Sequence, residues 1–178
     1  PSDSSGDSTA SQSNDDSGSS VKSNDDGSVN ADMTSFELVK VMGNGINLGN
    51  TMEAYTHYYG KEDIFTDESE QAWGQPITTP EMIKGMKDCG FDSLRVPVAW
   101  TNAMSWYEDG NYEIDKAYLD RVEEIVNYAI DADMYVVIND HWDGGWWGRF
   151  GSSDEKISSG AWDMYNALWG QIAERFKN

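Results

Sequence analysis

The chain has 178 residues and a formal net charge of −20, with 32 acidic side chains against 12 basic ones. This excess of negative charge repels nucleic acid and anionic membranes, so neither is an expected partner, whereas neutral ligands such as sugars are compatible with it. The length allows one ordinary domain, and no apolar run approaches the roughly 20 residues that span a bilayer. The 8 Trp and 9 Tyr residues are many for this length, and such rings can either fill a core or stack on sugars.

The first 34 residues differ in composition from the rest of the chain. They are almost entirely Ser, Asp, Asn and Gly, so they cannot bury enough apolar surface to offset the entropy lost on ordering. We therefore predict a disordered, Ser/Asp-rich segment over residues 1–34 and a folded part over residues 35–178. Composition leaves open whether the segment is an untidy terminus or a flexible linker to another module upstream.

The first two helices are predicted from their end signals. A short helix starts at Thr34 or Ser35, either of which can cap it, and ends at Val41. Thr79 is a good N-cap for a second helix, because the next residue is a proline that fits the first helical position. Gly90 marks the end of this helix, where a left-handed residue is commonly needed.

The next two helices are predicted from apolar periodicity. Asp115 caps a helix whose apolar residues recur at helical spacing. A glycine- and tryptophan-rich loop is predicted from Asp140 to about Gly160, and a last helix follows it. The apolar face of this last helix is predicted to consist of Ala161, Tyr165, Leu168, Ile172 and Phe176.

Three apolar strands alternate with these helices. They are predicted over residues 46–50, 91–98 and 134–139, and Pro97 should mark the end of the second because it cannot donate to a ladder. Continuous apolar strands that alternate with amphipathic helices are typical of a parallel sheet covered by helices. The fold class is therefore α/β, and both an open doubly wound sheet and an eight-stranded β/α barrel fit the pattern.

The polar residues at the strand ends favour the barrel. After the first strand, residues 49–51 are Gly-Asn-Thr and start no glycine-rich phosphate loop, so a dinucleotide site is not expected. Barrel enzymes instead gather polar residues at the C-terminal ends of their strands. This chain does so after each strand, with Asn47, Asn50, Arg95, Asn139 and His141. Because three strand–helix units cannot close a barrel that needs eight, we expect the sequence to be the N-terminal part of a longer TIM-type barrel domain.

Arg95 and His141 are the candidate chemical groups at these strand ends. Arg95 lies inside an apolar strand, where it could either pair with a buried structural carboxylate or hold a catalytic carboxylate ionised and oriented. His141 follows the third strand directly, and it could be a hydrogen-bonded structural histidine or a ligand of a sugar hydroxyl. The position of both residues at the carboxyl ends of strands favours the site role.

The loop after the third strand is the second candidate feature. Its sequence WDGGWW places Trp142, Trp146 and Trp147 beside glycines on a loop, where they are poorly placed to pack into one hydrophobic core. This arrangement favours a platform on which pyranose rings stack. The alternative is that one or two of these rings only cover the top of the barrel. No spacing of His, Cys, Asp or Glu matches a recognised metal motif, so no metal and no cofactor are expected.

Several stretches carry a family resemblance. The sequence GINLGNTMEA at residues 45–54 is followed by AWGQP at residues 72–76, and then by the strands at residues 91–98 and 136–141. In this order they resemble the catalytic domains of glycoside hydrolase family 5, in particular endo-β-1,4-glucanases of anaerobic bacteria. The resemblance covers roughly residues 36–178.

The resemblance implies an eight-stranded β/α barrel and a retaining hydrolase with two catalytic glutamates, an acid/base after the fourth strand and a nucleophile at the seventh. It also implies that Arg95 supports the nucleophile and that His141 binds sugar near the cleavage point. A second histidine often follows in the family, whereas this chain has Trp142 there. Three glutamates of the early loops match neither catalytic role, namely Glu53, Glu68 and Glu70. We therefore expect this chain alone to lack both catalytic glutamates and to be inactive.

The sequence thus predicts a secreted, extracellular endo-β-1,4-glucanase (cellulase) that acts on β-glucan. Arg95 and His141 are its predicted supporting catalytic residues. Its predicted substrate-binding residues are Asn47, Asn50, Asn139, Trp142, Trp146 and Trp147. The alternative is a non-catalytic glycan-binding protein that uses the Trp-rich loop, although such modules are usually closed β-sandwiches. Cellulose, mixed-linkage glucan, xyloglucan and mannan all remain open as substrates.

Overall fold

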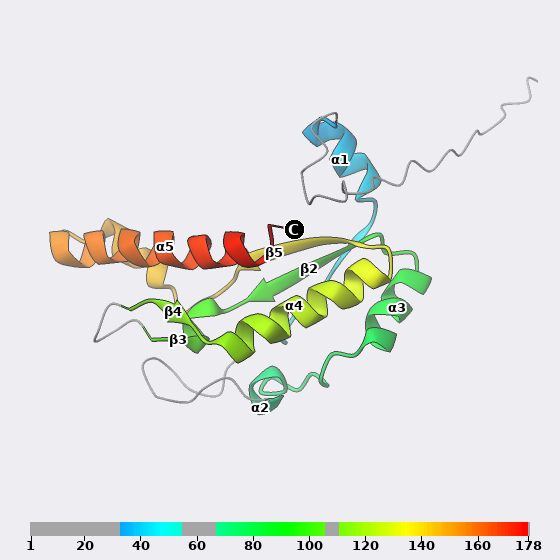
Figure 1. Ribbon diagram of the computed structural model, residues 1–178, viewed down its shortest axis with the longest axis horizontal. Coiled ribbons are helices and arrows are strands. Elements are labelled where there is room, and N and C mark those ends of the chain that lie inside the picture. The colour runs from blue at the N-terminus through cyan, green and yellow to red at the C-terminus, as the bar shows by residue number, and fades with distance from the viewer. Residues whose placement is uncertain (1–32, 55–66, 106–110, 178) are drawn as a thin grey trace, which may run out of the picture.

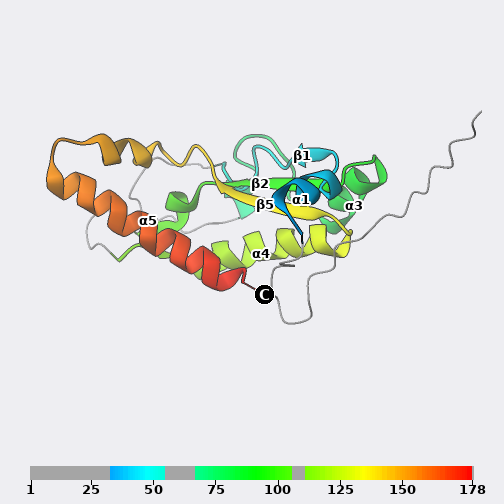
Figure 2. The same ribbon diagram turned by 90° about the horizontal axis from the view of Figure 1, so that it is seen from above.

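Three parallel strands, each followed by a helix, form the centre of the computed structural model, which describes residues 33–54, 67–105 and 111–177. The strands pair in the order β1-β2-β5, and their bounds are β1 (Gly45–Asn47), β2 (Ser93–Val98) and β5 (Tyr135–Asp140). The helices that follow them are α3 (Pro80–Asp88), α4 (Lys116–Asp131) and α5 (Glu155–Arg175). Figures 1 and 2 show α4 along one side of the sheet and α5 extending beyond its edge.

Smaller elements surround this sheet. The helices among them are α1 (Ser35–Val41), α2 (Asp67–Glu70) and the 3₁₀ helices η1 (Trp100–Ala103) and η2 (Trp146–Gly151). Two short strands, β3 (Met104–Ser105) and β4 (Glu113–Ile114), pair antiparallel. Most of the segment predicted to be disordered, residues 1–32, lies outside the described residues. In the described part of the chain, no helix combines the length and apolar character needed to cross a membrane.

The core lies between the sheet and its helices. Leu94, Val96 and Val98 alternate along β2, so they point to one face, and all three are fully buried. They belong to the same buried cluster as Val122 and Ile125 of α4. This face therefore supplies the packing energy of the unit, as expected for a sheet covered by helices.

The predicted ends of α3 and the predicted start of α4 are confirmed. Thr79 caps α3 by accepting a hydrogen bond from the backbone N–H of Met82 at 3.4 Å, and Gly90 takes the left-handed conformation just after the helix, with φ +91°. Asp115 caps α4 in the same way by accepting from the N–H of Tyr118 at 3.1 Å. These ends follow from local side-chain-to-backbone bonds, which is why the sequence predicted them.

Several boundaries and one helix face differ from the prediction: β2 begins at Ser93 and continues one residue past Pro97, and β5 is shifted by one residue. The first strand ends at Asn47 and not at residue 50. Helix α5 begins at Glu155, inside the predicted loop, because Asp154 caps it by accepting from two backbone N–H groups. On this helix Met164 is fully buried, whereas Tyr165 is 40% exposed, so the apolar face is turned slightly from the predicted one. The short helix α2 and the short strands β3 and β4 were not predicted, because elements of two to four residues are too short to show a period of apolar residues.

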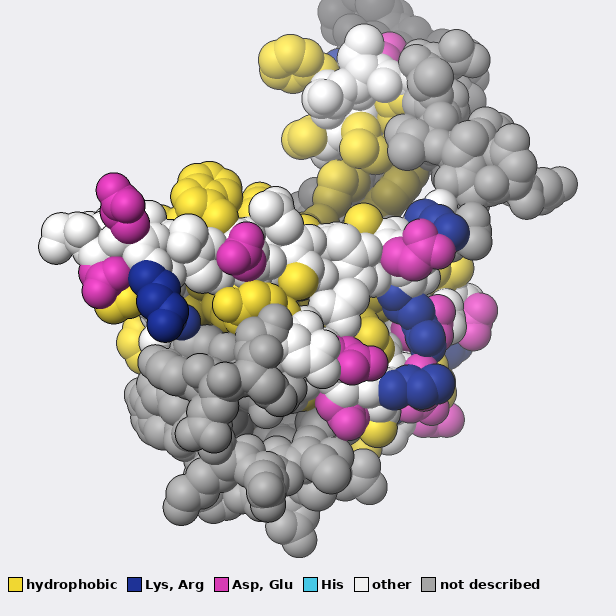
Figure 3. Space-filling view, turned by 60° about the vertical axis from the view of Figure 1, so that its left-hand side comes forward, with side chains coloured by type: hydrophobic (Ala, Val, Ile, Leu, Met, Phe, Trp, Pro, Cys, Tyr) yellow, Lys and Arg dark blue, Asp and Glu magenta, His cyan; other side chains and the backbone are white. Residues whose placement is uncertain are grey.

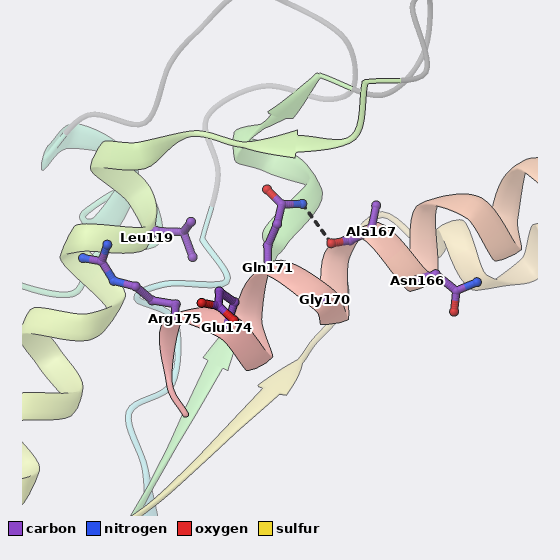
Figure 4. A pocket seen from close by; sticks show the side chains of 7 residues that line it. All are labelled: Leu119, Asn166, Ala167, Gly170, Gln171, Glu174 and Arg175. Atoms are coloured by element: carbon purple, nitrogen blue, oxygen red, sulfur yellow. Dashed lines mark hydrogen bonds between the residues drawn. The ribbon is translucent and has the colours of Figure 1, made fainter. Parts of the chain in front are cut away.

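Polar contacts attach α5 to the rest of the unit. Gln171 accepts from the N–H of Ile114 at 2.9 Å and donates to the carbonyl of Tyr112 at 2.8 Å, and Arg175 donates to Asp120 of α4 at 2.6 Å. Between α4 and α5 lies an open groove of about 600 Å³, which Leu119 lines from α4. Figure 4 shows that the remaining lining residues come from α5. None of the predicted site residues lines this groove.

Candidate active site

The face of the sheet opposite the buried core carries the predicted polar residues. Asn47 pairs in register with Arg95, and Arg95 with Val137. Because side chains alternate along a strand, these three residues share one face, and Asn139, two positions after Val137, shares it too. Asn47 is exposed and Val137 is 38% exposed, so this face is open around Arg95, whereas Ser93 and Pro97 on the same face of β2 are buried.

A row of hydrogen bonds joins three of these side chains. Arg95 donates from Nη1 to Oδ1 of Asn47 at 3.1 Å, and its Nη2 lies 3.1 Å from Nδ1 of His141. A guanidinium group can only donate, so Nδ1 of His141 accepts this bond, and a neutral imidazole then carries its proton on Nε2. The backbone N–H of His141 donates to the carbonyl of Val98 at 2.9 Å, which fixes the histidine against the end of β2. The row therefore has an N–H donor on Nε2 of His141 and further guanidinium donors on Arg95 that are not used within it.

Asn139 and Asn50 lie at the two ends of this row. The side-chain amide of Asn139 donates to the carbonyl of Asp140 at 2.8 Å and lies 3.5 Å from Nδ1 of His141. Its Oδ1 is buried and accepts no hydrogen bond from the described residues. Asn50 is exposed and takes the left-handed conformation, with φ +62°, in the turn that follows β1. Both asparagines thus stand at the carboxyl ends of their strands, as predicted, although only Asn139 contacts the row.

The Trp-rich loop divides its three tryptophans between two environments. Trp142 is 52% exposed and Trp147 is 41% exposed, whereas Trp146 is only 4% exposed. The indole N–H of Trp146 donates to Oδ2 of Asp140 at 3.2 Å, and its ring packs on Phe150 with a centroid distance of 5.5 Å. This corrects the prediction of a stacking role for Trp146, because its ring is used in packing. Figure 3 shows hydrophobic side chains reaching the surface between polar ones on the side of the molecule that it faces.

The chain is similar to known glycoside hydrolases over most of its length. Residues 52–178 match the family model described as cellulase (glycosyl hydrolase family 5). The chain belongs to glycosyl hydrolase family 5. It is 39% identical over 147 residues to endoglucanase B of Clostridium cellulovorans, covering 83% of this chain and 29% of that protein. It is 36% identical over 148 residues to a xyloglucan-specific endo-β-1,4-glucanase of Bacteroides ovatus, covering 83% of this chain and 28% of that protein.

Solved structures agree with this family membership. A broad specificity endoglucanase from Ruminococcus champanellensis with bound cellotriose superposes with a TM-score of 0.71 at 37% sequence identity, covering 82% of this chain and 40% of that one. The chain thus spans less than a third of the two curated relatives above. The fold prediction is confirmed: the described residues form three strand–helix units of a family-5 β/α barrel, and the open face of their sheet is the inner face of that barrel.

Two buried glutamates of this family-5 chain have structural contacts. Glu53 accepts from the backbone N–H groups of Asn50 and Thr51 at 2.6 and 3.0 Å, so it closes the turn after β1. Glu70 accepts two bonds from Arg121 at 2.9 and 3.1 Å, in a bidentate pair that fastens α2 to α4. The hydrogen bonds with Glu70 raise the pKa of Arg121, although burial alone would lower it. The two carboxylates thus bond to a backbone turn and to Arg121, and neither forms a hydrogen bond with Arg95 in the described part of the chain.

Sequence reasoning missed a buried tyrosine that supports the site from below. The hydroxyl of Tyr118, on α4, donates to the carbonyl of Met52 at 2.5 Å and lies 3.3 Å from that of Ala99. It therefore ties the loop after β1 to the loop after β2. Burial raises the pKa of Tyr118 well above its ordinary value, and the nearby charge of Asp143 adds to this, so the hydroxyl stays neutral and donating. The sequence holds no local signal for this contact, because its partners are backbone carbonyls of distant segments.

The described residues do not form a metal centre. Within them, no group of three or more His, Cys, Asp or Glu side chains is arranged to hold an ion. The site therefore offers hydrogen-bond donors and acceptors, one guanidinium charge and exposed aromatic rings. These are groups that bind and orient a polar, uncharged ligand.

Proposed function

We propose that the protein containing this chain is an endo-β-1,4-glucanase that hydrolyses β-1,4-linked glucan with retention of configuration. The observation that carries this proposal is the hydrogen-bonded row of Asn47, Arg95 and His141 on the inner face of the barrel. Asn47 is the last residue of β1 and His141 directly follows β5, and the guanidinium of Arg95, within β2, reaches both. Barrel enzymes place their catalytic groups at this end. The names of the related proteins, which include several endoglucanases, support the same activity.

In this proposal Arg95 orients and keeps ionised the nucleophilic glutamate, which is supplied, together with the acid/base glutamate, by residues beyond these 178. Two N–H groups of the guanidinium already donate hydrogen bonds, one to Asn47 and one to His141. It has five N–H donors in all, so donors remain for a carboxylate placed over the row. Asn47 and His141 fix the plane of the guanidinium for that contact.

The remaining residues are proposed to bind the sugar. His141, held with its proton on Nε2, donates to a hydroxyl near the cleavage point. Asn50 and Asn139 supply polar contacts at the two sides of the row. Trp142 and Trp147, which are both substantially exposed, stack on glucose rings through their apolar faces.

The proposed substrate is a chain with a β-1,4-glucan backbone. One relative is named for xyloglucan, and one solved structure, of a broad specificity endoglucanase, holds cellotriose. Xyloglucan and cellotriose share the β-1,4-linked glucose backbone, which is why we commit to the backbone and not to its branches. We also propose that the protein is secreted, because a polymer of this size is degraded outside the cell.

The test is to follow hydrolysis of soluble β-1,4-glucan by the full-length enzyme. An endo-acting enzyme lowers the viscosity of the polymer early, while few reducing ends have formed, and a retaining one releases the β-anomer first in a proton NMR time course. The variant His141→Ala should slow both signals, which assigns the hydrolysis to this site. Binding of the polymer without any hydrolysis would overturn the proposal and favour a non-catalytic glycan-binding protein.

A further inference from the structure

A pair of interacting carboxyl groups, one of them fully buried, lies at the start of the Trp-rich loop, outside the row that contains Arg95. Asp143 has an exposed fraction of 0%. Both of its oxygens accept from the backbone N–H of Thr101, each at 2.9 Å, and one also accepts a short hydrogen bond from the Thr101 hydroxyl. Because Thr101 belongs to η1 and Asp143 follows β5, these bonds fasten the loop after the third strand to the segment after the second.

The second carboxyl group of the pair belongs to Asp140, at the end of β5. Its Oδ2 accepts from the indole N–H of Trp146 at 3.2 Å, while its Oδ1 is buried and receives no donor from the described part of the chain. Burial raises the pKa of both acids, and for Asp143 the adjacent charge of Asp140 raises it further, to well above the ordinary value. Two carboxyl groups that interact in this way favour a state in which one proton serves both, because a single proton removes their mutual repulsion.

The loop above this pair has a backbone that needs an anchor. Trp142 has a φ of +43°, and Gly144 and Gly145 have φ values of +63° and +69°. A tryptophan in the left-handed region is strained, and such strain persists only where the surroundings hold it in place. Trp142 directly precedes Asp143, so the hydrogen bonds of Asp143 hold the strained residue.

The two exposed tryptophans are each adjacent to an anchored residue. Trp142 is bonded in sequence to Asp143, and Trp147 follows Trp146, whose indole is fixed by Asp140. Both exposed tryptophans are therefore joined directly to residues that the two carboxyl groups hold.

We propose that Asp143, sharing one proton with Asp140, is a positioning residue that holds Trp142 and Trp147 in the orientation that binds β-glucan. The identity of the ligand rests on the proposed function, whereas the anchoring of the loop does not. Asp143 acts through the tryptophans and touches no sugar. Its loss therefore affects substrate binding in the ground state and the transition state alike, which raises KM and leaves kcat nearly unchanged.

The kinetic test compares Asp143→Ala with Asp143→Asn in the full-length enzyme, with cellotetraose as substrate. Asn keeps an acceptor for Thr101 and supplies a donor to Asp140, so it mimics the protonated acid, whereas Ala removes both contacts. We expect KM to rise about tenfold or more in Asp143→Ala and to stay within about threefold in Asp143→Asn, with kcat within about twofold in both. Asp163→Ala, at an exposed acid of α5, is the matched control and should leave KM unchanged.

The dependence of KM on pH distinguishes an effect of the shared proton from an effect of the hydrogen bonds with Thr101. KM of the wild type should rise as pH increases and the pair loses its proton, whereas KM of Asp143→Asn should stay level over the same range. The other titratable groups near the pair are His141, beside Asp140 on β5, Tyr118 of α4 and Glu53 of the loop after β1. All of them remain in Asp143→Asn, so the difference between the two profiles reports the proton of the pair.

A third measurement needs no substrate. With 5-fluorotryptophan in the full-length enzyme, the fluorine NMR resonances of Trp142 and Trp147 can be assigned from Trp142→Phe and Trp147→Phe. Both resonances should shift or broaden in Asp143→Ala and keep their wild-type positions in Asp143→Asn. If Asp143→Ala does not fold, the pH profile and spectrum of Asp143→Asn decide in its place.

The outcomes distinguish the two proposals. Unchanged resonances and unchanged KM in Asp143→Ala would overturn the positioning role. An Asp143→Asn variant as impaired as Asp143→Ala, or one that keeps the pH dependence of the wild type, would overturn the shared proton. Shifted resonances in an enzyme that hydrolyses no β-glucan would leave the anchor in place and reject the proposed function.

Discussion

The two faces of strand β2 differ in what their side chains do. Leu94, Val96 and Val98 point to the helices and are fully buried, so they hold the unit together. Arg95, between the first two, points to the other face and forms hydrogen bonds with Asn47 and His141. One step along a strand thus separates a residue of the core from a residue of the site. Neighbouring substitutions should therefore give opposite results: loss of stability on one face and loss of activity on the other.

The largest effect is expected on the packed face. Leu94→Ala removes a fully buried side chain from the core. It should lower the free energy of unfolding by about 2–5 kcal/mol, through lost apolar transfer energy and the cavity left behind. Denaturant unfolding of the full-length protein measures this. The folded variant should keep the kcat of the wild type, and a large fall in its kcat would contradict the separation of the two faces.

The converse result is expected one residue away. Arg95→Ala in the full-length enzyme should cost about 2–4 kcal/mol of transition-state stabilisation, because a charge-assisted contact to the nucleophile is lost. Its loss of unfolding free energy should be smaller than that of Leu94→Ala, since the side chain is only partly buried. Steady-state kinetics and thermal unfolding of the same samples check both parts. Arg95→Lys keeps the charge without the planar fork and should fall between wild type and Ala in kcat.

The carboxyl pair of Asp140 and Asp143 should make the free energy of unfolding depend on pH. The pKa of Asp143 is raised in the folded state by burial and then by Asp140, so the folded protein binds this proton more tightly than the unfolded chain does. Its contribution to stability is therefore fully present below the ordinary aspartate pKa of about 3.9. It is lost as pH rises through the raised pKa of the folded state. Unfolding measured across this range should show a fall in the wild type that is absent in Asp143→Asn, and parallel curves would contradict the shared proton.

The smallest effect is expected at the rim of the site. Trp147→Ala removes one exposed stacking face, which should weaken binding by about 0.5–1.5 kcal/mol and raise KM roughly 2- to 12-fold at nearly constant kcat. Phe36→Ala is the control, because this ring is 85% exposed but lies on α1. Kinetics on cello-oligosaccharides of increasing length measure the effect. Equal changes in both variants would show that the KM effect is not specific to the loop.

The sequence predicted the elements and their order because their signals are local. Thr79 and Asp115 bond to backbone groups three residues away, and these caps need no knowledge of the rest of the fold. The alternation of apolar strands with amphipathic helices then predicted a parallel sheet, and the polar residues at the strand ends predicted a barrel. The pairing of Asn47 with Arg95, which puts both on one face, was not predicted, because it depends on the register of two strands.

The tertiary structure alone decided which side chains of the loops are buried. Trp146 and Trp147 are neighbours in sequence with the same chemistry, yet one packs under the loop and the other is exposed. Asp143 can be buried because Thr101 supplies hydrogen bonds to it, and Thr101 lies 42 positions earlier in the chain. Glu70 is likewise held by Arg121, 51 positions later. Burial of a polar group depends on partners that only the folded chain brings together, since without them the cost of desolvation would keep the group at the surface.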